Sequence, residues 1–81
     1  MTEKEVMPAI CSGWMLRASA LGLKKGGAKY LTDMEAYMQG ALAALVAAGL
    51  MTPERAGMFA FLTSVGRLPK LVEDRAKEYK E

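Results

Sequence analysis

The stretch AYMQGALAALVAAGLMTP, residues 36–53, carries no charged side chain and decides the fold of this chain. A membrane-spanning helix needs about 20 consecutive apolar residues, whereas Gln39 and Gly40 interrupt this run and Gly49 is placed to end it. Many of the other positions are alanine, which inserts weakly into bilayers. We therefore expect no membrane span but a helix that is apolar nearly all round, which a small protein can bury only as the central element of a bundle.

Helix signals continue on both sides of this stretch, and strand signals are almost absent. TEKE at 2–5 and TDME at 32–35 have the spacing of capping boxes, in which a threonine and a glutamate bond to each other's backbone amides at a helix N-terminus. Thr52 before Pro53 is a further helix start. Glycines are placed to stop three helices: Gly22, Gly49 and Gly66. The sequence thus predicts helices at about 3–22, 32–48, 53–65 and 69–79.

These elements predict an all-α fold with a single domain over residues 1–81, a small up-down helical bundle of three main helices plus a short C-terminal helix. Apolar residues at helical spacing predict the buried stripe of the third helix: Met58, Phe61, Leu62 and Val65. Small residues at every fourth position predict a close antiparallel hairpin of the second and third helices: Ala36, Gly40, Ala44 and Ala48 on one, Ala56, Ala60 and Ser64 on the other.

The chain has more apolar residues than a protein of its length can enclose. Hydrophobic residues alone make up 52% of its 81 residues, and the chain has eight glycines as well. In ordinary globular domains, apolar residues and glycine together make up only roughly 45–50%. A chain this short buries only about 60–65% of its unfolded surface. We therefore expect a non-enzymatic protein-binding module that acts as a homodimer or higher oligomer and also binds an unidentified protein. The interface residues expected are Trp14, Tyr37, Met38, Leu42, Leu45 and Val46.

Several kinds of chemistry are disfavoured by composition. The chain has no histidine and a single cysteine, Cys11, so transition-metal sites and histidine-activated nucleophiles are not expected. We predict no catalytic residue, no metal and no cofactor. A lone cysteine cannot form an intramolecular disulfide, and MTEKEV at the start shows no secretory pattern, so a cytoplasmic location is expected.

An up-down bundle would bring two basic segments to one end, around the N-terminus of the second helix. The residues of this basic end are Lys24, Lys25, Gly26, Gly27, Lys29, Arg67 and Lys70. Cations and a helix N-terminus are the ingredients of an anion site, so an alternative function is sequestration of an anion or nucleotide, with a phosphate-containing ligand. The other interpretation is a solvated face with Asp33 and Glu35 nearby. A nucleic-acid-binding regulator is less favoured, because the net charge is only +2.

The segment MQGALAALVAAGLMTPERAGMFAFLTSVGR, residues 38–67, resembles the small uncharacterised helical proteins that bacteriophages and prophages encode. The likeness covers about a third of the chain and rests on the general style of a helical hairpin. It implies a viral accessory protein, many of which bind and inhibit a host factor or a defence system. These proteins share no motif, so the resemblance assigns a role to no single residue.

Overall fold

A computed structural model describes residues 2–79 of the chain and shows an all-helical protein in that range. Its elements are α1 (Glu3–Ala20), α2 (Ala28–Ala47), α3 (Pro53–Ser64) and α4 (Leu68–Lys77). The all-α class and the four helices predicted from the sequence are confirmed. No described helix is both long and apolar enough to cross a bilayer.

The predicted glycine stops lie directly after the ends of α1, α2 and α3. Gly22, Gly49 and Gly66 have φ values of 65°, 74° and 73°, the left-handed conformation that glycine adopts without steric cost. The amide two residues after each helix's C-cap bonds back to a carbonyl of its last turn, as Leu23 N–H does to Ala18 O at 3.0 Å. This is the Schellman arrangement, which satisfies carbonyls that the helix leaves unpaired.

The helix starts were predicted less well than the stops. Thr52 caps α3 as expected, its Oγ1 accepting from Arg55 N–H at 3.2 Å. The prediction that α2 begins at residue 32 was wrong: the helix starts four residues earlier, and the Thr32 hydroxyl donates to Ala28 O inside it. At α1, Thr2 bonds to the Glu5 carboxylate at 3.1 Å rather than to a backbone amide. Spacing alone cannot tell a capping threonine from one that bonds back to the preceding turn.

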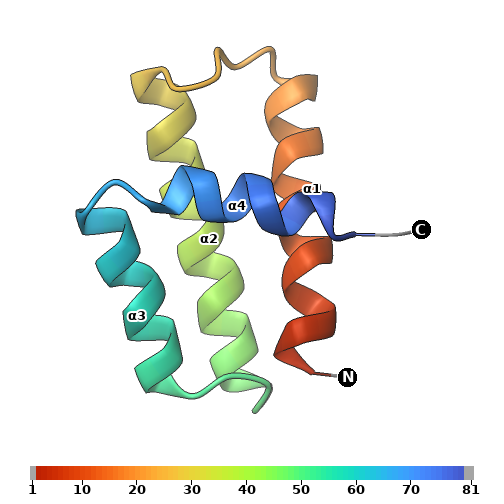
Figure 1. Ribbon diagram of the computed structural model, residues 1–81, viewed down its shortest axis with the longest axis vertical. Helices are drawn as coiled ribbons and strands as arrows, with labels where there is room; N and C mark the ends of the chain where they lie inside the picture. The colour runs from red at the N-terminus through yellow and green to blue at the C-terminus, as the bar shows by residue number, and fades with distance from the viewer. Residues whose placement is uncertain (1, 80–81) are drawn as a thin grey trace.

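α1, α2 and α3 lie side by side, and α4 crosses α2 and α1 (Figure 1). α1, α2 and α3 run alternately up and down, with α2 in the middle, and α4 passes across α2 and α1 on one face at mid-height. α1 packs more extensively against α4 than against α2. The first and last helices of the chain therefore close the core together.

The core is built mainly from methionine and aromatic side chains of α1 and α2, closed by α4. Its most deeply buried members are Trp14, Met34, Met38, Val72 and Cys11. The Trp14 ring lies edge-on to Tyr30, with centroids 5.4 Å apart, and 5.8 Å from the Tyr37 ring. The Tyr30 hydroxyl donates to Met15 Sδ at 3.7 Å. Met7, Met34, Met38 and Met51 belong to this core, since the flexible methionine side chain adapts to irregular spaces between helices.

The expected close approach of the small-residue faces of α2 and α3 is wrong. Ala36, Gly40, Ala44 and Ala48 are exposed, and a Cβ added at Gly40 would meet nothing within 4 Å. Instead, α2 turns its larger side chains toward α3, where Met38 and Leu42 line a small cavity together with Phe59. Burying methionine and leucine removes more apolar surface from water than burying alanine. The face of α2 with the larger side chains is therefore the one that packs toward α3.

Gly13, in the middle of α1, makes room for Tyr37. A Cβ built on Gly13 would lie 2.8 Å from the Tyr37 hydroxyl oxygen, and the ring is held in place against Trp14. Replacing glycine by alanine inside a helix normally adds about 0.5–1 kcal/mol of stability. Here we expect Gly13→Ala to lower the free energy of unfolding by about 1 kcal/mol because of the overpacking, and to raise it in a Tyr37→Phe background. Urea unfolding of the four variants tests this, and a change of the same sign in both backgrounds would contradict it.

Candidate functional site

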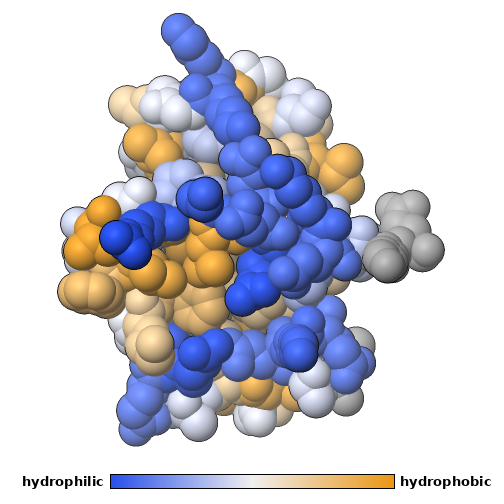
Figure 2. All heavy atoms as spheres, viewed as in Figure 1, coloured by the Kyte–Doolittle hydropathy of each residue, from blue (hydrophilic) through white to orange (hydrophobic). Residues whose placement is uncertain are grey.

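The side of α3 turned away from the core carries large apolar residues. Successive helix positions are about 100° apart, so Phe59 and Phe61 point in nearly opposite directions. Phe59 is the one that is buried, at 8% exposure, and Phe61 is 64% exposed. Met58 at 57% and Val65 at 48% share its side of the helix. Figure 2 shows hydrophobic residues along the left edge of the molecule, where α3 lies.

This arrangement corrects the predicted buried stripe of the third helix. Of the residues expected inside, only Leu62 is partly buried against the core, whereas Met58, Phe61 and Val65 face solvent. The helical spacing identified an apolar face, but Phe59, which lies outside that face, is the residue that enters the core. We call the exposed set Gly57, Met58, Phe61, Ser64 and Val65 the α3 outward face.

The other exposed large apolar residues do not form such a set. Leu16 at 67% lies on α1, Leu21 at 54% directly follows that helix, and Tyr79 at 41% follows α4. Scattered exposed apolar side chains are normal on protein surfaces, whereas a contiguous group points to an interaction. The α3 outward face is therefore the candidate functional site.

The interface residues expected from the sequence lie elsewhere. Trp14, Met38, Leu42 and Leu45 are in the core of the single chain, with exposures of 0%, 1%, 8% and 5%. Such side chains cannot offer a surface to a partner while the chain keeps this fold. Tyr37 and Val46 are partly buried and pack against the same core.

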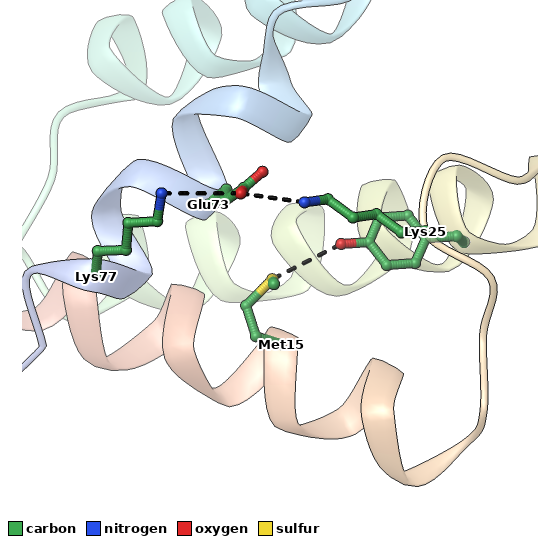
Figure 3. A network of polar contacts seen from close by, with 5 residues as sticks. Met15, Lys25, Glu73 and Lys77 are labelled. Atoms are coloured by element: carbon green, nitrogen blue, oxygen red, sulfur yellow. Dashed lines mark hydrogen bonds and ion pairs between the residues drawn. The ribbon is translucent and has the colours of Figure 1, made fainter.

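At the basic end, the loop between α1 and α2 is tied to α4 by an ion pair. Lys25 Nζ donates to Glu73 Oε1 at 3.1 Å, and Lys77 Nζ lies 3.9 Å from the same oxygen (Figure 3). The hydrogen bond and the charge of Lys25 lower the pKa of Glu73, and the charges of Lys77 and Lys70 act in the same direction. Glu73, which was not predicted to lie at the basic end, therefore offsets part of its positive charge.

The other members of the basic end are exposed or serve the turn. Lys24, Lys29, Arg67 and Lys70 are exposed. Gly26 has a φ of 79°, and the Gly27 amide donates to Lys24 O at 2.9 Å, which closes the turn before α2. The Gly27 N–H is thus already engaged.

A hollow of about 330 Å³ lies where the beginnings of α1 and α3 meet the end of α4, over Met7 and Phe59. Figure 2 shows hydrophilic residues around a hydrophobic patch below α4. Two ion pairs stand at its rim: Arg55 to Glu3 at 3.0 Å and Arg75 to Glu78 at 2.8 Å. Each arginine already has a carboxylate partner, which leaves less positive charge for an anion in the hollow.

The one thiol of the chain is buried in α1. Burial raises the pKa of the Cys11 thiol to about 11, so it is protonated and unreactive at neutral pH. Within residues 2–79, no three side chains of the types Cys, Asp and Glu gather in a way suited to a metal ion. No protein family, curated protein or solved structure matches this chain.

Proposed function

We propose that this protein is a non-enzymatic protein-interaction module that works as a homo-oligomer in the cytoplasm, with the α3 outward face as its contact surface. The observation that carries the proposal is the exposure of Met58, Phe61 and Val65 on the side of α3 opposite the core. That side of a surface helix is ordinarily polar. Covering it would remove apolar surface from water without disturbing the fold.

The resemblance to small phage-encoded helical proteins adds a second class of partner to this proposal. A host factor or defence protein that this chain inhibits would be a further ligand of the module. The alternative, an anion- or nucleotide-sequestering protein that uses the basic end, has less support because Lys25 is already paired with Glu73. Binding that weakens steeply with added salt would favour that alternative.

The proposal is tested by placing a charged side chain on the apolar α3 outward face. We expect wild-type protein to rise above its monomer mass of 8.8 kDa at micromolar concentrations in light scattering, and Phe61→Glu to weaken association about 30-fold or more, the effect of losing an interface hot spot. The helical circular dichroism of Phe61→Glu should stay unchanged, because Phe61 is 64% exposed.

A matched control is available on α1. Leu16 is 67% exposed and belongs to α1, which lies on the other side of α2 from α3 (Figure 1), so Leu16→Glu adds the same charge at a site of similar exposure. We expect this variant to associate like the wild type. A wild-type protein that stays monomeric at high micromolar concentration, or equal effects of the two substitutions, would refute the proposal.

A further inference from the structure

The α3 outward face combines large side chains with gaps at a regular spacing. Met58, Phe61 and Val65 project from it. Gly57 and Ser64 lie on the same side and are exposed, and a Cβ added at Gly57 would meet nothing within 4 Å. Small residues thus lie beside large ones on one side of α3.

We propose that two copies of the chain pack α3 against α3 in antiparallel orientation, about a twofold axis at Phe61. The inference rests on the proposed function and names its partner and register. In this register Met58 lies opposite the partner's Ser64, and Val65 lies opposite the partner's Gly57. Each large side chain other than Phe61 then meets a small one, and Phe61 meets its own copy on the axis. An isologous contact of this kind closes on itself and gives a dimer.

Charges at the two ends of α3 favour the antiparallel orientation. Glu54 lies seven positions before Phe61 in α3, about 10–11 Å from the axis at about 1.5 Å per residue, and Arg67 lies just beyond the C-terminal end of α3, six positions after Phe61. Both are exposed, and within residues 2–79 neither takes part in an ion pair. An antiparallel pair places Glu54 beside the partner's Arg67 at both ends. A parallel pair would bring like charges together.

The size of the face sets the expected strength of the dimer. α3 has 12 residues and is therefore about 18 Å long. One face of such a helix offers less than the roughly 800 Å² that each partner buries in an interface of standard size. We therefore expect a concentration-dependent dimer in the micromolar range rather than an obligate one.

Charge reversal tests the register. Glu54→Arg and Arg67→Glu should each weaken the dimer about tenfold in sedimentation equilibrium, because each places like charges together at both ends of the pair. The double variant should regain wild-type affinity, since it restores both pairs with reversed sign. If the dimer affinity of the double variant falls below that of the wild type by the sum of the two single effects, the antiparallel register is wrong.

Filling the gap at Gly57 gives a second test, whose two readouts move in opposite directions. Gly57→Gln removes a helix-destabilising glycine, so the monomer should melt about 3–6 °C higher while dimer affinity falls about tenfold. Gly40→Gln is the matched control, since Gly40 of α2 also has open space around it. It should raise the melting temperature equally and leave the dimer unchanged.

The outcomes separate this inference from the proposed function. If Phe61→Glu abolishes the dimer but charge reversal and Gly57→Gln leave it intact, the α3 outward face is the contact surface and the register is wrong. If none of these substitutions affects the dimer, the contact lies elsewhere and both proposals fail. A monomeric wild type likewise overturns both.

Discussion

Trp14→Ala is expected to lower the free energy of unfolding by about 3–5 kcal/mol, the cost of emptying a fully buried tryptophan site. Trp14 has no exposed surface and packs against both Tyr30 and Tyr37. Because a domain of this size has a total stability near the lower end of about 5–15 kcal/mol, the variant should be largely unfolded at 37 °C. Urea unfolding followed by circular dichroism measures the loss.

Trp14→Phe removes the indole N–H at the same site and keeps an aromatic ring there. Among the described residues, Trp14 Nε1 is a buried polar atom without a hydrogen-bond partner, and such a group costs about 1–3 kcal/mol. Phenylalanine keeps an aromatic ring and removes this N–H, so we expect Trp14→Phe to cost much less than half of what Trp14→Ala costs. Equal losses for the two variants would contradict this expectation.

The second large effect is expected at Val72, the fully buried valine of α4. Val72→Asp would place an unpaired carboxylate where α4 packs on α1, and we expect a loss of more than about 4 kcal/mol, with α4 released from the core. Denaturant unfolding measures the loss, and hydrogen exchange of the α4 amides shows whether the helix has separated.

Val65→Asp is the matched control for this experiment, because Val65 is 48% exposed on the α3 outward face. We expect it to change the stability of the monomer by about 0.5 kcal/mol or less, while weakening self-association. Comparable losses of monomer stability at positions 65 and 72 would contradict the orientation of α3 described above.

The local signals in the sequence predicted helix ends well where a single backbone conformation decides them. Gly22, Gly49 and Gly66 stop helices because a left-handed residue is needed there. Thr32 was wrongly predicted to cap α2. A threonine hydroxyl can either cap a helix start or donate to a carbonyl of the preceding turn, and Thr32 donates to Ala28 O inside the helix. The spacing of the residues predicted that these segments are helices, but it predicted the first residue of α2 wrongly.

Contacts between distant segments could not be predicted. The pattern of α3 shows that Met58, Phe61 and Val65 share a side, but whether this side or Phe59 enters the core depends on how α2 and α4 pack. The partnership of Lys25 with Glu73 joins residues 48 positions apart. The candidate site was therefore missed, although Met58, Phe61 and Val65 had been predicted to share one side of the helix.

The crossing of α4 over α1 has a consequence for how the chain is made. The surface of α1 that packs against α4 stays uncovered until Val72 has left the ribosome, whereas Tyr30 and Tyr37 of α2 can already pack on Trp14. At about 5–20 residues per second, the nascent chain carries this apolar surface for several seconds, and joining its two ends then carries the entropic cost of closing a long loop. A proteolytic cut at Gly66 or Arg67 in the finished protein would sever the covering helix and expose the same surface.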